Sequence, residues 1–554
     1  MNTATTTGEA QIRDSAGYAK RKWTLGILSI ALIIIGLDIT VLNVAIPTLQ
    51  NSLNASASGL QWIINAYILV FAGVLLTMGS LGDRFGRRLA FQTGLVIFGL
   101  ASVGAAFSET TTQLIIARAG QGIGGALIMP STLSVIVDVF PREERAKAIG
   151  IWAGVAAIGI PGGMIAGGWL LENFFWGSVF LLNVPVVLVA LVGSVFLVPE
   201  SRDKNAKTTD IVGALISMAA LSLLIYTIIE APAQGWLAAV TIGGFASSLA
   251  FGALFVWYEL RREHPMVDLR LFLNARLSAS VGAIGIAFMA MLGMMFMLTQ
   301  FLQFVQGYSP LDTGIRLVPM ALGFMVGAPT SAILVARLNA RTVMTGGLFV
   351  VAVSVAGMAI LDIETAYWIT GSLIFAMGLG MSNVMAPATD AVMAAVPEAQ
   401  AGVGSALNDT IRQIGGALGV GIFGSILSSV YSSSMSDAIS GLGEGAAAAA
   451  SNSIGAALQV ADSLTGGTAG EELALASRQS FIDGTSIVYV VAGVVALVGT
   501  VLVWRFMPKH DLVAAPASGP APATDAPTIE LDVPGSTVDP AAGEPAAATV
   551  TIDR

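Results

Sequence analysis

Long apolar stretches separated by short polar segments dominate the pattern of this chain. A helix of about 20 apolar residues crosses the roughly 30 Å hydrocarbon core of a membrane, and fourteen stretches have that length. The pattern therefore predicts an all-α membrane protein. The predicted spans lie near residues 24–47, 60–79, 89–107, 113–136, 146–170, 178–198, 210–229, 237–258, 277–299, 314–335, 342–361, 366–388, 402–428 and 486–506.

Composition supports this class and argues against several others. Only 11% of the 554 residues are charged and the mean hydropathy is +0.79, whereas a soluble domain is about 25% charged. The chain has no cysteine, and its two histidines, His264 and His510, lie outside the predicted spans. We therefore expect no disulfide, no metal centre and no cofactor. No basic stripe, nucleophile–base set or phosphate loop is evident, so neither nucleic-acid binding nor an enzyme is expected.

The basic residues predict which side of the membrane each loop occupies. Arg and Lys cluster after the second, fourth, sixth, eighth and tenth spans, whereas the intervening loops carry none before Arg478. Because cytoplasmic loops hold the excess of Lys and Arg, both termini are predicted to be cytoplasmic, in a bacterial plasma (inner) membrane. Residues 1–22 would form a cytoplasmic N-terminal segment.

Two further segments fall outside the predicted spans. Residues 511–554 are rich in Ala and Pro, with acids and no aromatics, which predicts a disordered cytoplasmic tail. Residues 430–485 form an outward loop with helix-like stretches near 444–462 and 470–484. This loop is either a capping helical hairpin or a flexible linker.

Three charges inside predicted spans are candidates for function. Asp38 lies near the middle of the first span, where a carboxylate costs about 2.5 kcal/mol or more. Arg118 lies at a comparable depth in the fourth span, so the two residues form either a structural ion pair or a titrating site whose proton affinity Arg118 tunes. Asp409 and Arg412 are three residues apart on one helix face, which also fits a satisfied local pair.

Two glycine patterns stand out. In the loop after the second span, Gly79 and Gly86 permit a tight turn, Asp83 can accept hydrogen bonds from a helix N-terminus, and Arg84 and Arg87 face the cytoplasm. Alone, this loop would be a topology anchor. In the fifth span glycines recur every four residues and allow a second backbone to approach closely, although ordinary small-residue packing has the same pattern. These glycines are Gly159, Gly163 and Gly167.

Together these motifs resemble the major facilitator superfamily. The loop at 79–88 is similar to its motif A, Arg118 to Gly122 to motif B, 150–168 to the antiporter motif C, and the run around Asp38 to motif D. The chain resembles most closely the fourteen-helix drug:proton antiporters of the QacA/EmrB type. That resemblance implies two six-helix bundles with two extra central helices, within these boundaries: 23–200, 201–260 and 261–510.

The resemblance also implies roles for the motifs. Motif A latches the outward-open state, motif C seals the cytoplasm-open state, and Arg118 takes part in proton coupling. Asp409 corresponds to a second proton or cation site. One departure is that the usual Gly-Pro pair of motif C reads Gly163-Met164, with a proline earlier at Pro161, which shifts the expected kink.

A substrate cavity is predicted from polar, aromatic and methionine residues in two spans. Methionine and aromatic side chains form an adaptable apolar surface that attracts organic cations, although core packing or lipid contact is the alternative for each residue. Phe324 stands where some relatives for divalent cations carry an acid, which favours monovalent or neutral substrates. The predicted cavity residues are Trp62, Asn65, Tyr67, Met295, Phe296, Gln300, Phe301 and Gln303.

The sequence thus predicts a proton-coupled multidrug efflux antiporter. Its partners would be lipophilic or cationic small molecules, protons and the lipid bilayer, and we expect a monomer. A same-fold exporter of one metabolite or antibiotic is an open alternative, as are an inward proton symporter and a receptor of the same fold that transports nothing.

Overall fold

The computed structural model describes residues 16–202, 210–262, 265, 268–395, 401–464 and 468–508, and it contains helices and no strand within those ranges. Thirteen helices there are long and apolar enough to cross a membrane. The fifth predicted span is occupied by α6, a helix of 32 residues. The all-α prediction is confirmed, and each predicted span falls on a helix or on two consecutive helices.

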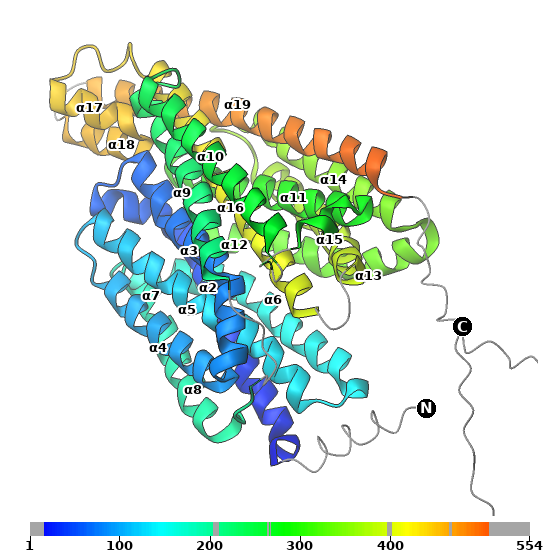
Figure 1. The fold of residues 1–554 in the computed structure, drawn as a ribbon. Helices are drawn as coiled ribbons and strands as arrows, with labels where there is room; N and C mark the ends of the chain where they lie inside the picture. Colours follow the sequence, from blue (N-terminus) through cyan, green and yellow to red (C-terminus); the bar gives the residue numbers. More distant parts are fainter. Residues whose placement is uncertain are drawn as a thin grey trace, which may run out of the picture. The chain divides into compact units, whose positions relative to one another are not determined.

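The first part of the chain contains α2 to α8, and two further helices, α9 and α10, connect it to the rest (Figure 1). Their bounds are α2 (Ala16–Leu53), α3 (Ala57–Phe85), α4 (Arg87–Ala106), α5 (Thr111–Val139), α6 (Arg142–Asn173), α7 (Ser178–Leu181), α8 (Asn183–Leu197), α9 (Ile211–Gln234) and α10 (Ala239–Arg261).

The second part contains α11 to α19, with a short π-helical continuation of α11 called η2. Their bounds are α11 (Ala275–Gln300), η2 (Phe301–Val305), α12 (Pro310–Arg316), α13 (Val318–Leu338), α14 (Ala340–Gly357), α15 (Tyr367–Ala395), α16 (Ala401–Ser434), α17 (Glu444–Asn452), α18 (Ile454–Ser463) and α19 (Ala469–Phe506).

Local sequence explains where several helices begin. Ser56 caps α3 by accepting a hydrogen bond from Gly59 N at 3.1 Å, and Thr110 caps α5 by accepting one from Gln113 N at 3.2 Å. Such side-chain caps satisfy backbone N–H groups that the first helical turn leaves unpaired. The polar residues between apolar stretches therefore set the helix starts.

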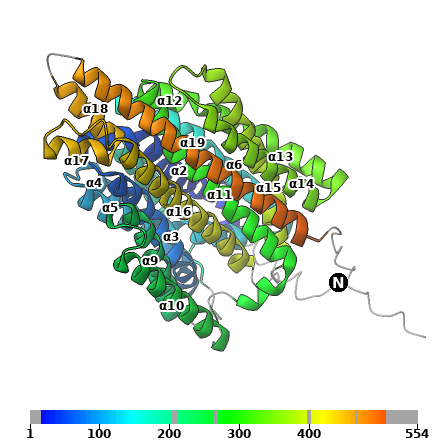
Figure 2. The same ribbon diagram turned by 90° about the horizontal axis from the view of Figure 1, so that it is seen from above.

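Four helices meet along one seam between the two parts of the chain. In this seam α2 and α3 belong to the first part and α11 and α16 to the second, with α3 packed on α16 and α2 on α11. Helices α9 and α10 lie side by side at the edge of the bundle, where α9 also contacts α3 and α16 (Figure 2). The seam is where pockets form.

The structure adds one detail to the predicted N-terminal segment. Helix α2 begins at Ala16, so residues 16–22 of that segment are helical. The remainder of that segment, residues 1–15, lies outside the described residues, as do 203–209 of the connection and the expected tail at 511–554.

The segment 430–485, predicted to be an outward loop, is more helical than a linker would be. Helices α17 and α18 are separated at Ser453, which is extended (φ −168°, ψ 151°) and caps α18. The second expected stretch, near 470–484, is helical, as the first part of α19, which runs without interruption from Ala469 to Phe506. That stretch has no proline to end a helix. Figure 1 shows α17 and α18 together at one end of the bundle.

Candidate functional site

The carboxylate of Asp38 is buried inside the first part of the chain. Its side chain and that of Arg118 are each only 1% exposed, and Arg118 Nη1 donates to Asp38 Oδ2. Burying both charges carries a desolvation cost that is offset only by good geometry and further hydrogen bonds. Such bonds are present: Arg118 also donates to Gln121 Oε1 at 2.8 Å and to the carbonyl of Ile63 at 3.2 Å.

Two amides hold the second oxygen of the same carboxylate. Gln121 Nε2 and Asn183 Nδ2 each donate to Asp38 Oδ1 at 3.0 Å. Both amides also donate to Ser102 Oγ, at 2.8 and 3.4 Å respectively. The result is a hydrogen-bonded network around one carboxylate, with residues from α2, α4, α5 and α8. We call it the Asp38 cage: Asp38, Ser102, Arg118, Gln121 and Asn183.

Sequence reasoning identified only part of this cage. Asp38 and Arg118 were predicted at comparable depth, and the structure places them in contact. Gln121 lies within the stretch that resembles motif B, but neither it nor Ser102 is predicted to have a role. Asn183 is an amide in an otherwise apolar stretch, where polar groups need partners, and this is the signal by which the sequence could have indicated it.

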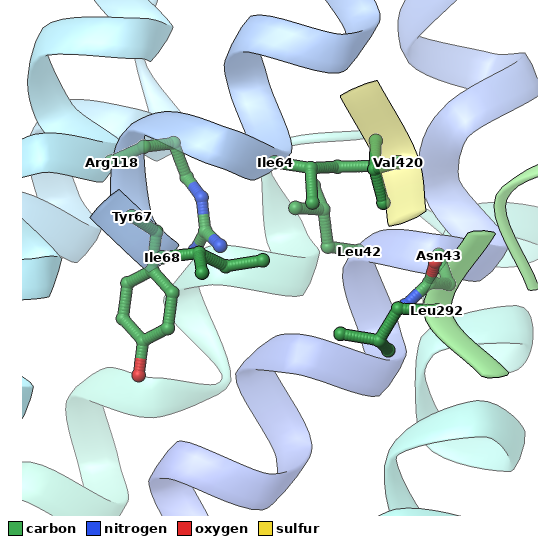
Figure 3. A pocket seen from close by; sticks show the side chains of 8 residues that line it. All are labelled: Leu42, Asn43, Ile64, Tyr67, Ile68, Arg118, Leu292 and Val420. Atoms are coloured by element: carbon green, nitrogen blue, oxygen red, sulfur yellow. The ribbon is translucent and has the colours of Figure 1, made fainter. Parts of the chain in front are cut away.

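A small pocket adjoins the cage at the seam. It is lined by residues of α2, α3, α5, α11 and α16, so both parts of the chain contribute to its wall. Figure 3 shows Arg118 and Tyr67 on one side of it. The Arg118 guanidinium lies over the Tyr67 ring, 4.6 Å from the centroid. The lining residues, which we call the central pocket, are Leu42, Asn43, Ile64, Tyr67, Ile68, Arg118, Leu292 and Val420.

Arg118 is therefore the link between the pocket and the buried acid. It lines the pocket and also binds Asp38, whereas Asp38 does not line the pocket. A molecule in the pocket would meet the guanidinium before the carboxylate. A molecule with a hydrogen-bond acceptor could therefore replace Asp38 as a partner of Arg118.

Asp409 has a looser environment. Its side chain is 13% exposed, and its ion pair with Arg412 has an Nη1–Oδ1 distance of 3.4 Å. Arg412 also donates to Thr389 Oγ1 at 3.3 Å and lies over the Phe288 ring at 5.8 Å. The structure thus brings Asp409 and Arg412 together as one local pair, away from the Asp38 cage.

The glycines of motif C lie where α6 crosses α2. A Cβ atom added at Gly159 would lie 3.2 Å from the Ile33 carbonyl oxygen, and one at Gly167 would lie 3.0 Å from Val41 Cγ1. At Gly163 an added Cβ would overlap Thr40 Oγ1. These glycines let α6 lie directly against the backbone that flanks Asp38.

A neighbouring face of α6 contacts the second part of the chain. A Cβ atom added at Gly168 would lie 2.6 Å from both Leu311 Cα and the Pro310 carbonyl oxygen at the start of α12. Side chains larger than glycine would separate these backbones. Helix α6 therefore connects α2 with α12.

The motif A residues form a network at the C-terminal end of α3. Arg87 donates to Asp83 Oδ1 at 2.8 Å and pairs with Asp138 at the end of α5. The acceptor role predicted for Asp83 thus involves the Arg87 side chain. Gly86 has a φ of +125°, and a Cβ there would lie 2.5 Å from Glu200 Oε1.

The two remaining predicted residues of motif A take no part in that ion network. A Cβ added at Gly79 would lie 3.2 Å from Pro130 Cβ, so Gly79 marks a close contact of α3 with α5. Arg84 is exposed and lies near the Phe85 ring.

The predicted cavity residues do not all lie at one site. Tyr67 lines the central pocket, and Phe296 and Gln300 line a second pocket further along the seam. Gln303 donates to the Val44 carbonyl at 2.9 Å and so joins η2 to α2. Asn65, Met295 and Phe301 are buried but line neither pocket.

Trp62 lines neither pocket. Its Nε1 donates to Glu230 Oε1 on α9 at 3.3 Å, and its ring lies 6.0 Å from that of Tyr226 on the same helix. The sequence places Trp62 on α3 without revealing that α9 covers this face, and its part in a substrate cavity stays a prediction.

Comparisons with known proteins agree with this architecture. The Salmonella typhimurium methyl viologen resistance protein SmvA is 37% identical over 494 residues, covering 88% of this chain and 99% of its own. The Mycolicibacterium smegmatis multidrug efflux pump LfrA is 35% identical, with 87% and 96% covered. The tetracenomycin C resistance and export protein of Streptomyces glaucescens is 33% identical, with 92% and 96% covered.

A solved structure and a family model extend the comparison. A bacterial homologue of the human lysosomal transporter Spinster, in an inward-facing and unoccupied conformation, has the same fold, with a TM-score of 0.60 at 18% identity and coverage of 89% of this chain and 98% of that one. The family model for the Major Facilitator Superfamily matches residues 28–420. The chain is an integral multi-pass membrane protein that belongs to the major facilitator superfamily of transporters.

Proposed function

We propose that this protein is a proton-coupled antiporter that exports lipophilic or cationic small molecules across the bacterial plasma membrane. The observation that carries the proposal is the Asp38 cage, because it holds an acid inside a membrane-spanning bundle next to a pocket at the seam. Ionisable groups in such positions mark ion or proton pathways. The efflux and resistance names of the relatives supply the direction of transport.

The architecture we propose has fourteen transmembrane helices. Thirteen of them would be the helices that are long and apolar enough to span, and α6 would be the fourteenth. Residues 23–200 and 261–510 would form two six-helix bundles, with α9 and α10 of the segment 201–260 between them. The loop basic residues support cytoplasmic termini, and the protein would act as a monomer.

In the proposed cycle, the proton bound by Asp38 and the substrate bound in the central pocket exclude one another. Protonation of Asp38 from outside would remove its charge and release Arg118, which would lower affinity for cationic cargo at the outer side. Deprotonation toward the cytoplasm would restore the cage and the site. The membrane potential contributes about 2.3 kcal/mol per charge per 100 mV whenever the exchange moves net charge.

The other predicted residues would either stabilise one conformational state of the transporter or form a second ion site. Asp409 would bind a second proton or cation beside Arg412. Motif A, held by Arg87 between Asp83 and Asp138, would stabilise one state. Motif C, where α6 meets α2 and α12, would stabilise the other.

The direct test is ethidium transport by proteoliposomes under an imposed pH gradient. The parent protein should move ethidium against its concentration gradient only while the pH gradient lasts. Asp38→Asn should not move ethidium against its gradient at all. If Asp38→Asn transports as fast as the parent, Asp38 is not the coupling site.

A same-fold exporter of one antibiotic or metabolite is the second candidate. It is favoured by relatives named for single compounds, such as the tetracenomycin C resistance and export protein. A panel of chemically unrelated cations and neutral amphiphiles separates the two: a multidrug exporter transports several, and a specific exporter only one.

A further inference from the structure

Three arginines at one end of the second part of the chain have no acidic partner among the described residues. Arg337 lies in the last turn of α13, Arg341 in the first turn of α14 and Arg505 in the last turn of α19. Their side chains form no ion pair and no hydrogen bond within the described part of the chain. Asp390, near the end of the neighbouring helix α15, is exposed and pairs with none of them. Their positive charge can therefore attract an anion from outside the chain.

The packing of α14 on α19 brings two of these helix ends together (Figures 1 and 2). A Cβ added at Gly499 would lie 3.1 Å from Leu348 Cδ2. Further toward the end of α19, the Arg341 guanidinium lies over the Trp504 ring, 4.4 Å from its centroid. The residue numbers rise on α19 as they fall on α14, so the helices are antiparallel and the Arg341–Trp504 contact lies at the end of their interface.

This contact joins helices that are far apart in the sequence, and it differs from a similar contact on α10. There Arg261 also lies 4.4 Å from the centroid of a tryptophan ring, but Trp257 is four residues away on the same helix. The next residue, Arg262, is paired with Asp210 at 3.7 Å. The end of α10 thus has an arginine–tryptophan contact without a group of unpaired arginines from several helices.

Arg341 has donors to satisfy. Its side chain is partly exposed, and its Nε is covered by protein without a hydrogen-bond partner among the described residues. A guanidinium carries five N–H donors and matches the oxygens of a phosphate or carboxylate especially well. Stacking on Trp504 orients the group and adds a cation–π contact. Arg341 is therefore placed to bind an anionic oxygen group at the end of α14 and α19.

An exposed apolar face runs along the same two helices away from the arginines. On α14 it includes Phe349 and Val353, and on α19 Val494 and Val501. A Cβ added at Gly346, three residues before Phe349, would meet no atom within 4 Å, so the surface is open there. Apolar faces of this kind are ordinary for membrane helices. The unpaired arginines at its end are what distinguish this face.

We propose that the ends of α13, α14 and α19 form a binding site for an anionic phospholipid. The lipid phosphate would bind Arg341, Arg337 and Arg505 would attract the negative headgroup, and the acyl chains would lie along α14 and α19. Basic groups between helices on the cytoplasmic side of a membrane favour anionic headgroups, and tryptophan is enriched at the headgroup level. We call Arg337, Arg341, Trp504 and Arg505 the lipid site.

This inference goes beyond the proposed function and takes from it only the cytoplasmic placement of these helix ends. A bound lipid needs neither substrate nor an ion gradient. The lipid site can therefore be tested separately from transport.

Quenching of Trp504 fluorescence by brominated lipids tests the proposal. The full chain is placed in phosphatidylcholine vesicles that contain an equal mole fraction of brominated phosphatidylglycerol or brominated phosphatidylcholine. The difference between the parent and Trp504→Phe isolates the signal of Trp504 from that of the other tryptophans. We expect the relative association constant at Trp504 to favour phosphatidylglycerol about fivefold or more.

Arg341→Gln should lower that preference about fivefold, which is the change expected from one basic residue at an anionic surface. Arg341→Lys, which keeps the charge and loses the planar donors, should lower it less. Arg261→Gln is the matched control, because it removes one arginine that lies over a tryptophan at the same distance. Its preference at Trp504 should equal that of the parent.

Several results would overturn the lipid site. Equal quenching by both lipids in the parent would show no headgroup preference, and equal losses in Arg341→Gln and Arg261→Gln would show only diffuse surface charge. If neither lipid quenches Trp504, a second copy of the protein covers this face. If sodium phosphate at the concentration of the lipid reverses the quenching, the arginines bind free phosphate instead.

The outcome is independent of the transport mechanism. A phosphatidylglycerol preference without pH-driven ethidium efflux would reject the proposed function and keep the lipid site. Efflux without that preference would keep the function and reject the lipid site.

Discussion

Two acids within long apolar helices, Asp38 in the first part of the chain and Asp409 in the second, are held in very different ways. Both oxygens of Asp38 accept hydrogen bonds, from one guanidinium and two amides, and its side chain is 1% exposed. Asp409 is 13% exposed and has a single 3.4 Å ion pair with an arginine one turn away. An aspartate in a membrane helix can thus have both carboxyl oxygens held by donors, as Asp38 does, or only one long ion pair, as Asp409 does.

The two acids differ in the hydrogen bonds that each would lose on binding a proton. A carboxylate held by several donors gives up at least one of them when it binds a proton, so protonation of Asp38 would alter contacts between the helices of the Asp38 cage. A loosely held carboxylate exchanges its proton with little structural change. Asp38 therefore suits the coupling of protonation to conformation, and Asp409 suits adjustment of charge in the pathway.

Removing the Asp38 charge should have the largest effect. Asp38→Asn leaves Arg118 buried without its counter-ion, which should destabilise the protein by about 3–5 kcal/mol and abolish pH-driven ethidium transport. The double variant Asp38→Asn/Arg118→Gln should recover much of the thermal stability while transport stays uncoupled. Recovery of transport together with stability would show that the pair is only structural.

The contact that positions α2 should come next. Gly163→Leu places atoms where Thr40 Oγ1 lies, and overpacking of this kind costs about 1–3 kcal/mol. Both the melting temperature and the ethidium transport rate should fall. Gly162→Ala is the matched control, because its Cβ would meet only Leu37 Cδ2, at 3.9 Å. Equal losses in the two variants would contradict a specific α6–α2 contact.

These two sites also show how far the sequence could lead. The Asp38–Arg118 pair and the α6 glycines follow from depth and spacing along single helices, and both lie where predicted. Asn183 and Ser102 join the cage through the packing of α8 and α4, which no single-helix pattern specifies. The contact of Trp62 with α9 could not be predicted for the same reason, since only the docking of α9 decides which face of α3 remains open.

Loss of one amide from the cage should have an intermediate effect. Asn183→Leu removes one of two donors to Asp38 Oδ1, and those donors favour the ionised carboxylate. A hydrogen bond to a charged group is worth about 1.5 kcal/mol or more, so the melting temperature of Asn183→Leu should fall and ethidium transport should slow without being abolished. An unchanged melting temperature together with an unchanged transport rate would contradict the role of the amide.

Asp409→Asn should have the smallest effect on stability. Its ion pair is partly exposed and long, and pairs of this kind contribute about 0–1 kcal/mol. Transport of ethidium should continue, with fewer protons moved per molecule exported, as measured by the gradient at which flux reverses. A collapse of folding or of all transport would make Asp409 equivalent to Asp38 and remove the distinction between the two regions.

The most direct measurement is proton movement during substrate exchange. Proteoliposomes loaded with a pH-sensitive dye, without an imposed gradient, receive ethidium on one side. The parent and Asp409→Asn should both move protons opposite to ethidium, and Asp38→Asn should move none. Proton movement of parental size in Asp38→Asn, at equal protein and equal ethidium flux, would contradict the account.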